Sequence, residues 1–180
     1  ISGDDSRRVS AIVRDLDNGL NHGDKQAVKN ELINRLGYSV EGSVVSSSLM
    51  TIAGNVIYLK NIGVRNIGKV VERLPSVLEL NVSYMADKFR YLTMYGAKVE
   101  DVENRPALLS YSMLARIVPR LRYVSSKVGD IKAAGLNAIN LLIPDDGKFI
   151  SILQRRGLNA DIGEYGKLLS SYKMVDELRK

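Results

Sequence analysis

The sequence predicts an all-α protein built from helical repeats of about 32 residues. A pattern of apolar residue, variable residue, Tyr and apolar residue recurs at steps of 33 and 32 residues, at Val56–Leu59, Phe89–Leu92 and Leu121–Val124. A Pro-led phrase recurs 31 residues apart, at Pro75–Leu78 and Pro106–Leu109. Apolar residues follow helical spacing throughout, and no segment alternates as a strand would. These observations predict a right-handed superhelical solenoid, in which each repeat packs on its neighbours.

Residues 1–44 are predicted to form a helical pair ahead of the repeats. An apolar stripe from Val9 to Leu20 indicates the first helix, and a second helix is expected between Asp24, a suitable N-cap, and Gly37. The polar stretch 42–48 is expected to be a link. Because the chain begins with Ile1 rather than Met, we expect it to be processed or trimmed.

Residues 45–157 are predicted to hold the repeats, each a helix, a shorter helix and a Pro-led turn. The first helix of each repeat is expected to end at a glycine, namely Gly63, Gly96 and Gly129. Proline starts a helix well but disfavours helix at the residue before it, so the Pro-led phrases should separate consecutive helices.

The last repeat is degenerate, as expected for a terminal repeat. A helix over 136–143 is expected, and Pro144 with two aspartates should start another that ends at Gly157. Carboxylate pairs at helix starts, Glu100 with Asp101 and Asp145 with Asp146, are interpreted as caps that complement the helix dipole. Residues 158–180 are predicted to form a C-terminal capping helix.

The positive charge is concentrated on the repeats. Residues 56–156 hold 16 Lys and Arg against 9 Asp and Glu, whereas residues 1–55 hold 6 against 7. A basic surface on an extended scaffold favours a polyanion partner over a merely solvated cationic face.

The basic residues of the repeats are therefore the candidate nucleic-acid contacts. Arg90 and Arg122 occupy the same repeat position, beside the motif tyrosine, and could present guanidinium groups in a row. The planar guanidinium suits phosphate because it donates two parallel hydrogen bonds. The full predicted set is Lys88, Arg90, Arg116, Arg120, Arg122, Lys127, Arg155 and Arg156.

The motif tyrosines Tyr58, Tyr91 and Tyr123 have two interpretations. They could stack on exposed bases. At a fixed position within an apolar helix, packing between repeats with the hydroxyl at the edge is the favoured interpretation.

Patterns typical of enzymes are weak in this chain. The segment 63–69 matches the glycine and lysine of a phosphate-binding loop, but Val70 stands where Ser or Thr should hold Mg²⁺, and a helix is expected before Gly63. The chain has no Cys and one His, His22, which excludes Cys/His zinc sites. We predict no catalytic residue, no metal and no cofactor. A nucleotide hydrolase would require Mg²⁺-dependent turnover lost in Lys69→Ala.

The segment 105–120 resembles the mitochondrial transcription termination factor (mTERF) family. Pro106-Ala107-Leu108-Leu109, then Tyr111-Ser112, then Arg116-Ile117-Val118-Pro119-Arg120 is similar to that family's "P-x-LL-x-YS" turn followed by "R-I-x-PR". The similarity covers roughly residues 45–157. It implies a half-ring of helical repeats with a basic groove for nucleic acid.

The resemblance also implies a site of action and a class of partner. We expect a non-enzymatic protein of mitochondria, or alternatively chloroplasts, acting in transcription termination, organellar gene expression or ribosome assembly. Its expected partner is double-stranded DNA or structured RNA, including ribosomal RNA with ribosomal proteins, and not a membrane or a small-molecule substrate. With about three and a half repeats, RNA is as attractive as DNA. The alternative is a protein-interaction scaffold without nucleic-acid contact.

Overall fold

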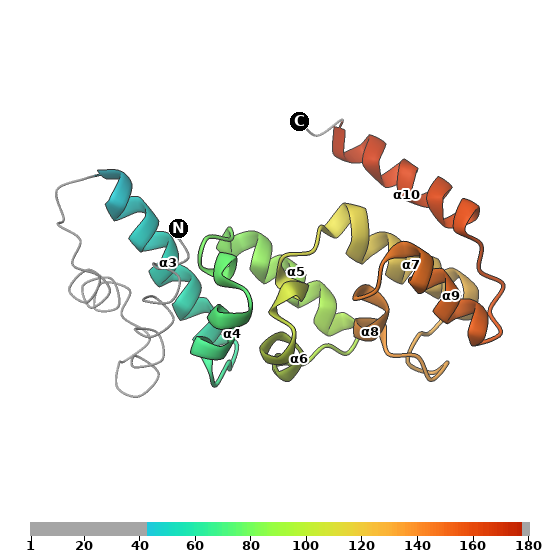
Figure 1. The fold of residues 1–180 in the computed structure, drawn as a ribbon, viewed down its shortest axis with the longest axis horizontal. Coiled ribbons are helices and arrows are strands. Elements are labelled where there is room, and N and C mark those ends of the chain that lie inside the picture. Colours follow the sequence, from blue (N-terminus) through green and yellow to red (C-terminus); the bar gives the residue numbers. More distant parts are fainter. Residues whose placement is uncertain (1–42, 178–180) are drawn as a thin grey trace. The chain divides into compact units, whose positions relative to one another are not determined.

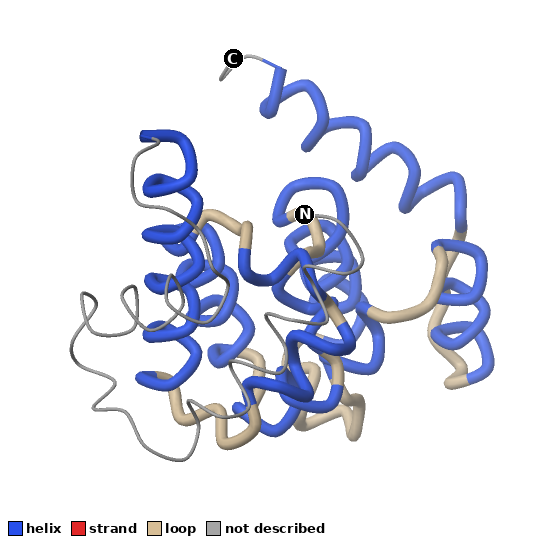
Figure 2. The backbone as a smooth tube through the Cα atoms, turned by 60° about the vertical axis from the view of Figure 1, so that its left-hand side comes forward, coloured by secondary structure: helices blue, strands red, loops and turns tan. Residues whose placement is uncertain are grey.

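The structure is a computed structural model that describes residues 43–177, whose helices are shown in Figure 1. These residues divide into two compact units. The first unit holds residues 43–90 and 98–110, and the second holds residues 91–97 and 111–177. Loops join the helices, and the described range contains no strand (Figure 2). The all-α prediction is confirmed over this range, whereas the superhelix and the predicted division at residues 44 and 157 stay predictions.

The first unit repeats the predicted order of long helix, short helix and Pro-led turn. Helix α5 begins in this unit and its last turn belongs to the second. The elements are α3 (Ser43–Asn61), α4 (Ile67–Arg73), the 3₁₀ turn η1 (Pro75–Leu78), α5 (Val82–Met94), α6 (Val99–Asn104) and the 3₁₀ turn η2 (Pro106–Leu109).

Glycines and caps end and start these helices as predicted. Gly63 and Gly96 follow α3 and α5 with φ of +98° and +89°, a left-handed conformation that costs other residues a steric penalty. Gly63 therefore terminates a helix, and the 63–69 segment has a structural explanation. Asp101 accepts a hydrogen bond from the backbone N–H of Lys98 (2.8 Å), which confirms its capping role.

The predicted link over residues 42–48 is wrong from Ser43 onward, because α3 already begins there. Serine and valine carry only modest helix penalties, so a polar composition does not break a helix whose apolar stripe continues beyond it. The predicted helices before residue 43, and His22 with them, lie outside the described residues.

The core of the first unit joins both repeats of that unit. Residues of α3, α4, η1, α5, α6 and η2 share one apolar cluster whose members are at most 5% exposed: Ile52, Val56, Ile57, Leu59, Val64, Ile67, Val70, Val71, Val77, Leu78, Met85, Val102 and Leu109. Each short helix and turn is thus held against the long helix of its repeat by apolar burial.

The second unit continues with shorter pieces. Its elements after the end of α5 are the π-helical turn η3 (Met113–Ile117), α7 (Val118–Val128), α8 (Ala138–Leu142), α9 (Asp146–Arg155) and α10 (Ile162–Glu177). The helix predicted over 136–143 is shorter because Asn137 caps it and Gly135 adopts φ of +70° just before. The helix expected near the C-terminus is confirmed as α10.

A π-helical turn interrupts the helix of the third repeat, which was expected to end at Gly129. The backbone N–H groups of Ile117 and Val118 donate to carbonyls five residues earlier, those of Ser112 and Met113. Pro119 has no N–H to donate, and its ring would clash with the carbonyl four residues before it. The extra residue per turn relieves that conflict ahead of α7.

An aromatic trio forms the centre of the second unit. Tyr123, Phe149 and Tyr165 lie edge-on to one another, with ring centroids 5.3–6.4 Å apart, and each is at most 2% exposed. These rings join α7, α9 and α10. No described helix is long and apolar enough to cross a membrane, and no three described His, Asp or Glu side chains gather as a metal site.

Candidate nucleic-acid interface

The residue just before each tyrosine motif is a hydrogen-bond donor to the turn of its own repeat. In the first repeat, Asn55 is fully buried and its side-chain amide donates to the carbonyls of Val77 (2.9 Å) and Leu80 (2.8 Å). In the second, Lys88 Nζ donates to the carbonyl of Leu109 (2.9 Å). Burial lowers the pKa of Lys88, since it disfavours the charged form.

Arg120 holds this position in the third repeat and makes the largest set of bonds. One guanidinium nitrogen donates to the carbonyls of Leu141 (3.0 Å), Leu142 (3.1 Å) and Pro144 (2.7 Å), and another to Asp146 (2.8 Å). Its side chain is 2% exposed and lies over the ring of Phe149. Carbonyls at the end of a helix have no partner within that helix, so Arg120 serves as a side-chain cap for α8.

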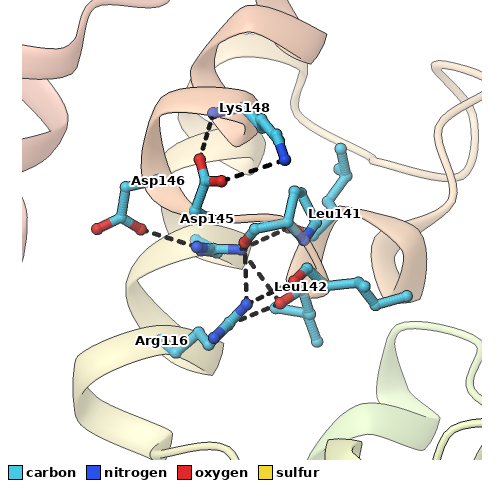
Figure 3. Close-up of polar contacts among 9 residues, drawn as sticks. Arg116, Leu141, Leu142, Asp145, Asp146 and Lys148 are labelled. Atoms are coloured by element: carbon cyan, nitrogen blue, oxygen red, sulfur yellow. Dashed lines mark hydrogen bonds and ion pairs between the residues drawn. The ribbon is translucent and has the colours of Figure 1, made fainter.

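Arg116, one turn earlier, reaches two of these carbonyls and one more. It donates to Leu142 (2.7 Å), Ile143 (2.6 Å) and Pro144 (2.9 Å), and its guanidinium carbon lies 4.1 Å from the ring centroid of Tyr111. Figure 3 shows Arg116 directed toward the carbonyl of Leu142. Both arginines therefore donate to the carbonyls of Leu142 and Pro144, and these bonds join η3 and α7 to α8.

These contacts change the candidate surface. Arg120 has no exposed guanidinium to offer a phosphate, and Arg116 and Lys88 are half-buried with their donors directed inward. We leave these three residues out of the proposed surface. A signal for Lys88 and Arg120 was present in the sequence, because each lies in phase with the apolar stripe of its helix, as Asn55 does (for example Ile117, Arg120, Leu121 and Val124).

Arg90 and Arg122 lie two residues further along and are exposed. Successive α-helical residues are about 100° apart, so a residue two positions beyond the inward donor lies on the opposite side of the helix, and in the second and third repeats that side is exposed. The side chain of Arg90 is 79% exposed and pairs with Asp87 at 2.7 Å. In the first repeat the same slot holds Ile57, which is buried. Arg90 and Arg122 belong to different units, so the predicted row of guanidinium groups stays a prediction.

Arg155 and Arg156 are also exposed. They close α9, where Arg155 occupies the last helical position and Arg156 the C-cap, followed by Gly157 with φ of +77°. Asp145 caps the other end of α9 by accepting from the backbone N–H of Lys148 (2.8 Å), and this bond lowers the pKa of Asp145. The predicted capping role of Asp145 is confirmed, whereas Asp146 pairs with Arg120.

Lys127 is engaged with α10. Its Nζ donates to Glu164 at 2.6 Å and lies 5.1 Å from the ring centroid of Tyr123. The hydroxyl of Tyr123 donates to the same Glu164 oxygen at 2.7 Å.

The favoured packing interpretation of the motif tyrosines is confirmed for Tyr123, which is 2% exposed. Tyr58 and Tyr91 are half-buried, so part of each ring reaches solvent. Burial is the main cause that raises the pKa of all three, since it disfavours the phenolate.

The recurring helix, short helix and Pro-led turn, with arginines exposed at one repeat position, define a helical-repeat protein with a basic surface. The mTERF family model matches residues 27–143, well over half of the chain. The chain belongs to the mTERF family, whose members are organellar helical-repeat proteins associated with nucleic-acid binding. The match begins ahead of residue 45, where the repeats were expected to start. No match is found among curated proteins or solved structures.

Proposed function

We propose that this protein is a non-enzymatic component of organellar gene expression that holds double-stranded DNA or structured RNA through exposed arginines of its repeats. The observation that carries the proposal is that basic residues two positions apart have different surroundings. Lys88 and Arg120 donate hydrogen bonds to carbonyls inside the protein. Arg90 and Arg122, two residues further along, are exposed to solvent.

Exposed guanidinium groups can exchange their present partners for phosphate at low cost. The Arg90–Asp87 pair is solvent-exposed on both sides, and such pairs contribute little to stability. A phosphate group offers Arg90 two oxygens that can accept parallel hydrogen bonds instead. Arg155 and Arg156 would add two further contacts from α9. Such contacts supply affinity and register more than base specificity.

Membership of the mTERF family supports an organellar nucleic acid as the partner. We propose ribosomal RNA, in a mitochondrial ribosome or an intermediate of its assembly, and a DNA termination site as the two candidate partners. The mitochondrion is the proposed compartment, and the chloroplast is the alternative.

The test compares two double variants of the full chain that remove equal charge. The slot variant, Arg90→Gln with Arg122→Gln, removes the two exposed arginine charges at this repeat position. The control variant, Arg65→Gln with Lys132→Gln, removes two exposed charges elsewhere. Fluorescence anisotropy would record binding of a labelled DNA duplex and an RNA hairpin across a salt series. The slot variant should make the negative slope of log K against log salt shallower by about 1.4–1.8, the value for two lost phosphate contacts.

Equal slopes for the two double variants would reject the assigned slot. Absence of salt-dependent binding to either probe by the unmodified chain would reject nucleic-acid binding itself and favour the protein-interaction scaffold.

A further inference from the structure

Two donors of α7 converge on one carboxylate oxygen of α10. The Tyr123 hydroxyl and Lys127 Nζ both donate to Glu164 Oε2, at 2.7 Å and 2.6 Å. The Tyr123 oxygen also accepts from the backbone N–H of Asp161 at 2.9 Å, and Glu164 is nearer to the hydroxyl than its second acceptor, the Asp161 carbonyl at 3.3 Å. A hydroxyl and an ammonium group that meet at one oxygen form an anion site.

The donors are held rigidly. The ring of Tyr123 is packed between Phe149 and Tyr165, with centroids 6.4 Å and 5.4 Å away, so the position of its hydroxyl is determined by the core. The side chain of Lys127 is 17% exposed and lies over the same ring. A pre-positioned pair of donors loses little entropy when it binds an anion.

The present occupant is held more loosely than the donors. The side chain of Glu164 is 54% exposed, so its carboxylate can rotate into solvent without uncovering the core. Its neighbour Tyr165 is 1% exposed and anchors the first turn of α10 independently. The donated hydrogen bonds from Lys127 and Tyr123 lower the pKa of Glu164 and keep it anionic.

We propose that Tyr123 and Lys127 form a phosphodiester-binding site that Glu164 fills in the free protein, and that a phosphate of bound nucleic acid replaces the carboxylate there. The inference rests on the proposed function and adds a named contact to it. Lys127 is then a phosphate contact, but only after the phosphate has displaced Glu164. Glu164 acts as an internal competitor, which weakens the binding of polyanions that make no other contact with the protein.

The remainder of α10 is consistent with such exchange. Beyond Tyr165, the apolar residues Leu168, Leu169 and Tyr172 are only half-buried, and Met174 is 63% exposed. Small adjustments of α10 that accommodate a phosphate beside Lys127 therefore disturb little buried apolar surface.

The experiment measures binding of the same DNA duplex and RNA hairpin to full-length variants by anisotropy across a salt series. Glu164→Gln removes the competing charge and keeps an acceptor for Tyr123. Glu100→Gln, at an exposed carboxylate on α6, removes an equal charge elsewhere and is the matched control. Glu164→Gln should raise affinity about two- to five-fold over the control, the worth of one exposed ion pair. The gain should disappear in the double variant with Lys127→Met.

The outcomes separate the inference from the proposed function. If the unmodified chain binds with a salt-dependent affinity but Glu164→Gln matches Glu100→Gln, the anion site is wrong and the proposed function stands. If neither probe binds any variant, both are wrong. Circular dichroism would verify folding. Should Glu164→Gln unfold, Glu164→Asp, whose shorter carboxylate cannot reach both donors, must show a gain in the same direction for the inference to survive.

Discussion

Replacing Arg120 with methionine should destabilise the protein without removing a nucleic-acid contact. Methionine retains much of the apolar stem but deletes every guanidinium donor. The carbonyl of Leu141 then loses its donor, while those of Leu142 and Pro144 keep bonds from Arg116. Asp146 is 48% exposed and can turn to water.

The size of the expected destabilisation follows from which of these groups lose their hydrogen-bond partner. An unsatisfied buried carbonyl costs about 1–3 kcal/mol. Breaking a buried charge pair by removing one partner costs about 3–5 kcal/mol, and the partial exposure of Asp146 places this case at the lower end. We expect a loss of about 3 kcal/mol in the free energy of unfolding. For a chain of this length that corresponds to a melting temperature about 6–12 °C lower.

The matched control is Arg122→Met, two residues along the same helix. It should change stability by no more than about 0.5 kcal/mol, the usual range for an exposed position. Urea unfolding followed by circular dichroism measures stability, and anisotropy measures the salt slope on the folded variants. A stable Arg120→Met variant with a reduced salt slope would refute the reasoning, because Arg120 would then be a phosphate contact.

Three further outcomes are expected. Asn55→Ala should lower the free energy of unfolding in urea by about 2 kcal/mol, because two turn carbonyls lose their donor. An unchanged urea midpoint would show that these two hydrogen bonds do not stabilise the fold. Gly96→Ala should cost about 1–2 kcal/mol because φ is +89°, although no neighbouring atom obstructs the added methyl group; a neutral result would mean that the turn relaxes. The pKa of Glu164 is depressed in the folded state, so its contribution is fully present above its unfolded pKa of about 4.3 and is lost as pH falls through the folded pKa. The hydrogen-exchange protection factors of the first turn of α10, which correct for the slower intrinsic exchange at low pH, should therefore fall on acidification in the unmodified chain but not in Glu164→Gln, and equal pH profiles would contradict the assignment.

The repeat architecture was predictable because its signals are local. The left-handed glycines after α3 and α5, the prolines that start η1 and η2, and the spacing of apolar residues each act within a few residues of their own position. The π-helical turn before Pro119 was missed because helical periodicity over a few residues does not distinguish one extra residue in a turn. The link expected before residue 49 failed because composition is a weak guide to helix ends.

The candidate site was less predictable, because a basic residue may serve the surface or the interior. The sequence by itself determined the class of fold, the period, and the concentration of positive charge on the repeats. Only the tertiary structure decided that Arg120 caps the end of α8 while Arg122 faces solvent, and that Lys127 is held by Glu164 from a helix 37 residues away. The physical reason is that helix-end carbonyls need donors, and which side chain supplies them depends on segments brought together by folding.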